Sequence, residues 1–181
     1  FADATEELVQ LLGNLQTLHA QFSQIVFDGR GKAIQKASGE MFMQRPGKFR
    51  WQTFKPSKQL LIADGNQIWF YDVDLQQVTV QKQQAANHNS PAMLLSGSPE
   101  QLAQQFLIVK NDSSFKLTPK NSAGLFRSVQ LSFANQQLIG MKLVDNLGQV
   151  TTVQFSQVKN NPALSASLFI FKVPRGVDVV R

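Results

Sequence analysis

Apolar and polar residues alternate with a period of two over most of this chain, which is the pattern of β-strands that bury one face. Short turns rich in Gly, Pro, Asn and Asp separate the alternating segments, as at 45–47 and 64–66. Turns this short join antiparallel neighbours, because parallel strands need a much longer crossover. The pattern therefore predicts antiparallel strands at 20–28, 33–44, 48–54, 58–63, 67–73, 77–82, 107–111, 114–119, 125–133, 138–145, 150–158 and 168–172.

Helices are predicted in only two regions. Residues 3–19 carry leucines at helical spacing, and Asp3 is placed to cap the first turn. The leucines of this stripe are Leu8, Leu11, Leu12, Leu15 and Leu18. Within 90–105, two Ser-Pro pairs each place an N-cap before a proline that starts a helix. The helices they predict are too short to be stable alone, so they must lie on an apolar surface.

One large antiparallel sheet would present an apolar face wider than these helices can fill. The sheet either closes into a sandwich or barrel with a solid core, or curls and leaves a hollow. A solid core is the commoner outcome, whereas the 14 Phe and four Met residues favour an adaptable lining. Residues 68–71 are apolar on both faces, so we expect a cover on each side of that strand.

The net positive charge of the chain suggests an anionic partner, but the spacing of its basic residues does not support nucleic-acid binding. At 181 residues we expect one domain over 1–181, with strands ending at 172 and a tail at 173–181. The formal net charge of +6 suggests nucleic acid or an anionic surface. The basic residues are spread thinly, however, and we expect no nucleic-acid binding. Their densest group, which we consider as a partner face, is Lys48, Arg50, Lys55 and Lys58.

Catalysis finds little support in the sequence. No nucleophile elbow, zinc-protease motif, P-loop or dinucleotide fingerprint is present. His19 and His88 are far apart and read most simply as surface or packing residues. The absence of cysteine excludes disulfides and thiolate metal sites. We therefore predict no catalytic residue, no cofactor and no metal; a lipid-modifying or lipid-hydrolysing enzyme remains an alternative without a visible nucleophile.

Residues 41–51 form the most distinctive hairpin of the predicted sheet. Met41, Met43, Phe49 and Trp51 alternate on either side of the turn at 45–47. Proline fixes its own φ and favours an extended residue before it, while the glycine tolerates positive φ. This places a cation, Arg45, beside an apolar surface. Read without further context, it is a solvated arginine next to a turn.

The order and spacing of several short motifs resemble the periplasmic outer-membrane lipoprotein carriers, the LolA family, over essentially the whole chain. The matching pieces are His19-Ala20-Gln21-Phe22, Gly39-Glu40-Met41-Phe42, Arg45-Pro46, Phe49-Arg50-Trp51, Asp64-Gly65, Trp69-Phe70-Tyr71, Ser90-Pro91-Ala92-Met93-Leu94-Leu95, Leu117-Thr118-Pro119-Lys120 and Pro174-Arg175-Gly176-Val177. Each piece alone is weak, and the set is fairly specific.

The resemblance implies a mainly β fold with a helical lid: a curled, incompletely closed antiparallel barrel of about a dozen strands over an apolar cavity. It implies a periplasmic chaperone, a monomer secreted with a cleaved signal peptide. Such proteins take acylated lipoproteins from an inner-membrane ABC transporter complex to an outer-membrane lipoprotein receptor, without cofactor or chemistry. The alternatives are a non-catalytic envelope scaffold with a solid core and a general lipid-binding β-protein.

The resemblance also assigns roles to residues. Arg45 is expected to latch the lid by hydrogen bonds to lid backbone near Leu12 and around 95–96. The remaining expected lid residues are Pro91, Met93, Leu94, Leu95 and Ser96. The candidate cavity lining is Leu8, Leu15, Leu18, Phe22, Met41, Met43, Phe49, Trp51, Leu131, Met141 and Phe155.

Overall fold

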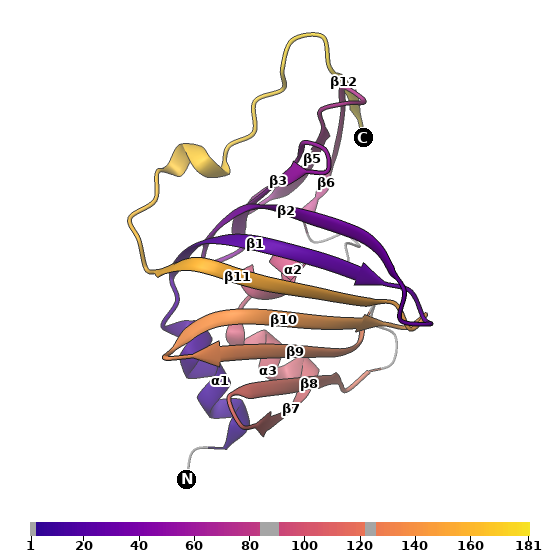
Figure 1. The fold of residues 1–181 in the computed structure, drawn as a ribbon. Helices are drawn as coiled ribbons and strands as arrows, with labels where there is room; N and C mark the ends of the chain where they lie inside the picture. Colours follow the sequence, from indigo (N-terminus) through magenta and orange to yellow (C-terminus); the bar gives the residue numbers. More distant parts are fainter. Residues whose placement is uncertain (1–2, 84–90, 122–125) are drawn as a thin grey trace.

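A single curved sheet dominates the computed structural model, which describes residues 3–83, 91–121 and 126–181 (Figure 1). Its strands are β1 (Thr17–Phe27), β2 (Ala33–Gln44), β3 (Lys48–Lys55), β4 (Gln59–Asp64), β5 (Gln67–Asp72), β6 (Gln77–Lys82), β7 (Phe106–Asn111), β8 (Ser114–Pro119), β9 (Phe126–Ala134), β10 (Gln137–Asp145), β11 (Val150–Asn160) and β12 (Asp178–Val180). The predicted meander is confirmed, although positions 90 and 125 of the predicted helix and strand ranges lie outside the described residues.

The strand order explains how two meanders become one sheet. It runs β12-β6-β5-β4-β3-β2-β1-β11-β10-β9-β8-β7. Pairing of β1 with β11 joins the first six strands to the later five, with Phe22 opposite Phe155. In the described part of the chain, the end strands β7 and β12 are not paired with each other, so the sheet curls without closing. The predicted incompletely closed, antiparallel β fold is confirmed.

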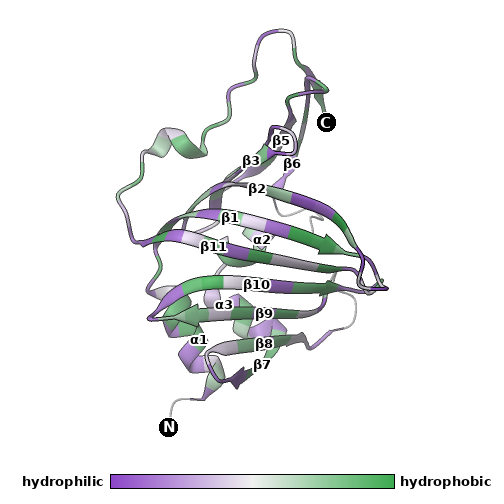
Figure 2. Ribbon diagram, viewed as in Figure 1, coloured by the Kyte–Doolittle hydropathy of each residue, from purple (hydrophilic) through white to green (hydrophobic). Residues whose placement is uncertain are grey.

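Alternation along the strands gives the sheet one apolar face. In β1, Leu18, Ala20 and Phe22 are buried between half-buried neighbours, and β3 buries Phe49 and Trp51 in the same way. Figure 2 shows the corresponding alternation of apolar and polar residues along the strands. Most buried side chains of both meanders belong to one hydrophobic cluster on the inner face of the curled sheet, whereas Val26, Ile62, Val78 and Val80 are buried outside it.

Three helices lie against this inner face: α1 (Ala4–Gly13), α2 (Pro91–Ser96) and α3 (Pro99–Gln105). In Figure 1, α2 and α3 lie behind the curved sheet and α1 lies beside them. The Asp3 carboxylate accepts a hydrogen bond from the Glu6 amide, and Ser98 caps α3 ahead of a proline, as predicted. No helix among the described residues is long and apolar enough to span a membrane.

The first helix is shorter than predicted. It ends at Gly13 rather than at 19, and the chain enters β1 at Thr17. The prediction was wrong because Leu18 fits both a helical stripe and the alternation Leu18, Ala20, Phe22 of a strand. Leu18 is paired with Met43 on β2, and the hydrogen bonds between these strands favour the strand over the helix at this position.

The C-terminal region also differs from prediction. Residues 168–172 are not a strand: a 3-10 helix, η2 (Ala166–Phe169), is followed by an extended segment without ladder bonds. Phe169 is buried and Phe171 stacks on Trp69 of β5 at 5.3 Å, so both aromatics pack although neither is in a strand. This segment covers one side of β5, where a cover was expected. Within the tail at 173–181, β12 pairs in parallel with β6.

Candidate functional site

The turn after β2 places Arg45 between the sheet and the helices. Its amide donates to the Gln16 carbonyl at 2.8 Å, which fixes the backbone beside the end of α1. Gly47 adopts φ +73°, a conformation that favours glycine, and its amide donates to the Ser96 carbonyl of α2 at 2.9 Å. The turn is therefore bonded through its backbone to the connection between α1 and β1 and to α2.

The Arg45 guanidinium binds backbone carbonyls at two helix ends. Nε donates to the carbonyls of Leu12 at 3.1 Å and Leu15 at 2.9 Å, and Nη1 donates to that of Gly97 at 2.5 Å. Leu12 lies in the last turn of α1, and Gly97 directly follows α2. Helix C-terminal carbonyls lack intrahelical partners and carry the negative end of the helix dipole, so a cation suits them. One side chain thus joins α1, α2 and the β2–β3 turn.

Only some of the hydrogen-bond partners of Arg45 were predicted from the sequence. Leu12 was expected as a partner and is one; on the α2 side the side chain reaches Gly97 rather than 95–96, where the Ser96 carbonyl accepts from Gly47 instead. Gln83 was not anticipated at all. Its Nε2 donates to the Gly47 carbonyl at 2.6 Å, and its Oε1 accepts from the Gly65 amide at 3.1 Å. Nothing local in the sequence marks Gln83, which acts across separate turns.

Burial of the Arg45 guanidinium carries a cost in desolvation free energy. Desolvation by burial lowers the pKa of Arg45 to about 10, and the nearby Glu100 carboxylate opposes that shift. The guanidinium stays charged at neutral pH, so the packed state bears the desolvation cost. Within the described residues, its Nη2 atom is buried without a hydrogen-bond partner. Opening of the helices would return this group to water.

The expected lining and lid residues come together in one place. All eleven lining candidates belong to the single hydrophobic cluster, and so do Leu12 and Leu95. Met93 and Leu94 pack against that cluster, while Pro91 and Ser96 are buried in α2. Ala92, between them in α2, is itself buried in the cluster. We call α1, α2 and α3 together the lid.

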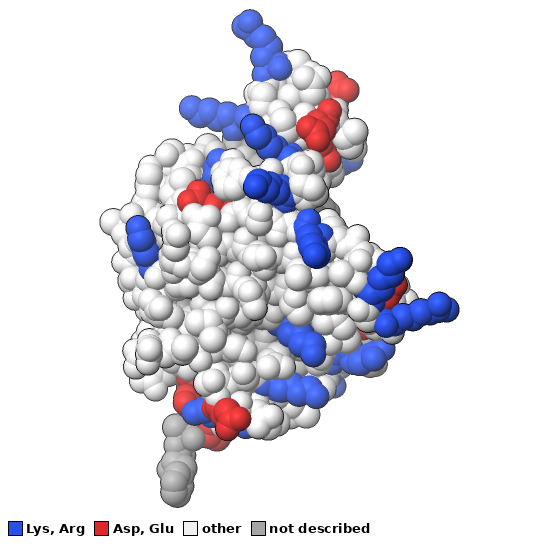
Figure 3. All heavy atoms as spheres, in the orientation of Figure 1, with Lys and Arg blue, Asp and Glu red and all other residues white. Residues whose placement is uncertain are grey.

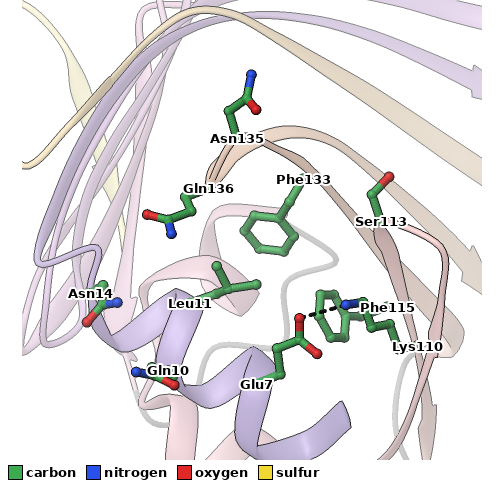
Figure 4. Close-up of a pocket in the computed structure, with 10 residues that line it drawn as sticks. All are labelled: Glu7, Gln10, Leu11, Asn14, Lys110, Ser113, Phe115, Phe133, Asn135 and Gln136. Carbon is green, nitrogen blue, oxygen red and sulfur yellow. Dashed lines mark hydrogen bonds and ion pairs between the residues drawn. The ribbon is translucent and has the colours of Figure 1, made fainter. Parts of the chain in front are cut away.

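Side chains of the lid, such as Leu8, Leu12 and Leu95, are buried against the lining candidates in one hydrophobic cluster. A pocket of about 180 Å³ includes Phe22, Trp51 and Pro91 in its wall, together with polar residues such as Gln24 and Gln35. A second pocket, of about 400 Å³, lies between α1 and strands β7–β9. Figure 4 shows Glu7 and Lys110 paired in it, at 2.7 Å, near Leu11, Phe115 and Phe133. Full access to the inner apolar face therefore requires the lid to move.

The other singled-out polar residues have structural partners. His19 pairs with the Glu40 carboxylate at 2.9 Å and stacks on Phe42, while His88 lies outside the described residues. Arg50 donates to the Leu168 carbonyl at 3.2 Å, and burial lowers its pKa against the opposing effect of Glu40. Lys48 and Lys55 stand at opposite ends of β3, so the basic group does not form one patch. The part of the chain that the structure describes holds no cluster of three or more residues suited to a metal ion.

Comparisons with known proteins agree with the motif-based resemblance. The family model described as "Outer membrane lipoprotein carrier protein LolA" matches residues 13–172. A relative from Coxiella burnetii is 44% identical over 99% of this chain and 88% of its own length, and one from Legionella pneumophila is 43% identical over 100% and 92%. Both are named outer-membrane lipoprotein carrier protein. The crystal structure of a LolA superfamily protein from Nitrosomonas europaea has a similar fold, with a TM-score of 0.52 at 9% identity over 94% of this chain and 99% of that one.

Proposed function

The chain belongs to the LolA family of outer membrane lipoprotein carrier proteins, and we propose that it binds the acyl chains of lipoproteins on the inner face of its sheet and carries them through the periplasm. One observation supports this most directly. The apolar inner face is covered by the lid, and the buried cation Arg45 joins the ends of two lid helices, α1 and α2, to the sheet. A cover held in this way can leave without dismantling the strands.

A carrier must bind acyl chains well and still release them. Each methylene removed from water contributes about 0.8 kcal/mol, so a lipoprotein with free acyl chains prefers a membrane or a micelle. An apolar face that is always open would retain such chains too strongly. When Leu95 and its neighbours occupy that face, the lid competes with the acyl chains. The apparent affinity is then the intrinsic affinity of the open state multiplied by the fraction of molecules that are open.

Arg45 is suited to hold a closed state of moderate stability. Its acceptors are carbonyls rather than a carboxylate, and its buried charge is only partly hydrogen-bonded. The hydrogen bonds favour the closed lid, while desolvation of the guanidinium favours the open one. These opposing contributions leave a small difference that acyl chains can reverse.

The remaining parts of the proposal follow from the family relationship alone. We propose that a monomer receives acylated lipoproteins from an inner-membrane ABC transporter complex and passes them to an outer-membrane lipoprotein receptor. The protein would be exported to the periplasm with a cleaved signal peptide. It would act as a chaperone rather than as an enzyme, without a cofactor.

Displacement of a solvatochromic fatty-acid probe tests the proposal. The probe is expected to bind the protein in solution and to be displaced by an acylated lipoprotein, because both occupy the apolar inner face. The same lipoprotein without its acyl chains is the matched control and should leave the probe signal unchanged. Equal displacement by both forms would show that the polypeptide, not the acyl chains, is recognised.

The burial of the lid helices also supports a second candidate, an envelope scaffold with a solid core. In that case the helices would be permanent parts of the core, because they bury Leu8, Leu12 and Leu95 as fully as the strands bury their own residues. The probe would then not bind in solution. A general lipid-binding β-protein would bind the probe but would not prefer acylated lipoprotein to free fatty acid of the same chain length.

A further inference from the structure

Two turns of this protein are built in the same way and end neighbouring hairpins. One spans 28–32 between β1 and β2, and the other spans 145–149 between β10 and β11. Each begins with an aspartate and has a glycine three residues later, Gly31 at φ +83° and Gly148 at φ +84°. In each, the first and fifth residues are bonded through the backbone, at 2.8 Å and 3.0 Å.

The aspartates hold both turns rigidly. Asp28 Oδ1 accepts from the amides of Arg30 at 2.9 Å and Lys32 at 3.0 Å. Asp145 Oδ1 accepts at 2.9 Å from the amides of Leu147 and Gln149. Both carboxylates are therefore engaged by their own turns, and the third residue of each turn, Arg30 or Leu147, contributes only its backbone to the geometry.

The sheet brings these turns into contact. Pairing of Phe27 with Val150 places the ends of the two hairpins side by side. A Cβ added to Gly148 would lie 3.9 Å from the Gly29 Cα, and one added to Gly29 would lie 3.8 Å from the Leu147 carbonyl oxygen. Figure 1 shows both hairpins ending together at the right-hand edge of the sheet. We call residues 28–32 and 145–149 the twin-turn tip.

The tip exposes an apolar side chain among cations. Leu147 is 90% exposed, and Ile34, just after the first turn, is 51% exposed. Arg30 and Lys32 are exposed on the same tip, and Arg127 of β9 donates to the Asn146 carbonyl at 3.5 Å. Figure 3 shows cationic side chains projecting at this edge of the molecule, with acidic atoms beside them that project less far. The fold gives no reason for a leucine at an exposed turn position where only the backbone is used.

We propose that the twin-turn tip contacts the surface of a membrane containing anionic phospholipids. Leu147 would enter the interface between headgroups and acyl chains, and Arg30, Lys32 and Arg127 would face the phosphate layer. Because both turns are already rigid, little conformational entropy is lost on contact. A small convex tip with one exposed leucine fits a soft bilayer surface better than an acidic protein, which would need a broader complementary face.

The position of the tip relates membrane contact to the proposed function, and this one step of the inference rests on that function. The pocket of about 180 Å³ on the inner face includes Gln24 of β1 in its wall. Gln24 is three residues from the strand end at Phe27, roughly 10 Å at the rise of a strand. The pocket also borders Pro91, the first residue of α2. Contact at the tip would therefore hold the start of α2 near the bilayer from which acyl chains arrive or to which they leave.

Vesicle flotation tests the contact without any lipoprotein. The wild-type protein is expected to float with vesicles of phosphatidylglycerol and phosphatidylcholine at low salt, and to bind phosphatidylcholine vesicles or high-salt samples far less. Leu147→Gln should weaken binding about tenfold, because it removes the apolar contact. The double variant Arg30→Gln/Lys32→Gln should weaken it roughly 25-fold, about fivefold for each charge.

Matched controls separate the tip from a generally basic surface. Leu75→Gln changes another exposed turn leucine, 69% exposed, whose amide also bonds an aspartate. Lys172→Gln/Arg175→Gln removes two exposed cations from the C-terminal segment. Neither control should change binding. Because the chain has no cysteine, Leu147→Cys and Leu75→Cys can each carry one polarity-sensitive fluorophore, which should shift to the blue with vesicles only at 147.

The outcomes are distinct from those of the fatty-acid test. Flotation that depends on Leu147 and on the two tip cations supports the proposal, whether or not the protein binds acyl chains in solution. No flotation with anionic vesicles overturns it. Equal losses in the tip variants and the controls would also overturn it, because a diffuse basic surface would then explain the binding.

Discussion

Replacing Arg45 with leucine is expected to raise the open population of the lid about 30-fold while leaving the sheet intact. The variant loses the charge-assisted bonds to the carbonyls of Leu12, Leu15 and Gly97 but also loses the cost of a buried charge. A net loss of about 2 kcal/mol for the closed lid corresponds to that factor. Amide hydrogen exchange in α2 and α3 measures it, because these amides exchange through lid opening.

Arg50→Leu is the matched control. Arg50 is also partly buried and also donates to a carbonyl, but that carbonyl belongs to Leu168 in the C-terminal segment. Its loss should leave exchange in α2 and α3 unchanged. If Arg45→Leu likewise leaves α2 and α3 protected, and lipoprotein transfer to membranes stays normal, Arg45 is not a latch.

Phe49→Ala and Leu95→Ala are expected to change fatty-acid binding in opposite directions, although both remove a fully buried apolar side chain. Phe49 lies on β3, so its truncation should lower the free energy of global unfolding by about 3–5 kcal/mol. It also removes part of the proposed binding face and should weaken probe binding. Leu95 lies on α2, where truncation weakens only the competitor of the acyl chains and should tighten probe binding.

The two losses of stability should also differ in extent. Truncation at Leu95 destabilises the closed state alone, so its effect on global unfolding cannot exceed the free energy of lid opening. Chemical denaturation monitored by fluorescence gives the free energy of global unfolding of each variant. A Leu95→Ala variant that is as destabilised as Phe49→Ala and binds the probe no better would indicate that α2 is part of a permanent core, as in a scaffold.

Local patterns predicted the strands well, because alternation and turn residues are read within a few positions. They failed where two patterns overlap, as at Leu18, and where apolar residues pack without ladder partners, as at Phe169 and Phe171. The role expected for Arg45 came from the resemblance, since an arginine beside a turn is ordinary.

Long-range geometry could not be read from the sequence. Gln83 bridges two turns that lie far from it along the chain. The two Asp-x-x-Gly turns are visible as separate motifs, but their contact depends on the pairing of β1 with β11. The packing of lid residues against the inner face likewise depends on where α1, α2 and α3 come to rest on the sheet.

The lid and the acyl chains are expected to occupy the same apolar face in turn. Hydrogen exchange of the wild-type protein, with and without a stoichiometric triacylated lipopeptide, tests it most directly. The loaded protein is expected to exchange its α2 and α3 amides faster, while the amides of β1, β3 and β9 stay protected. Protection of α2 and α3 that is unchanged or increased in the loaded protein would contradict it.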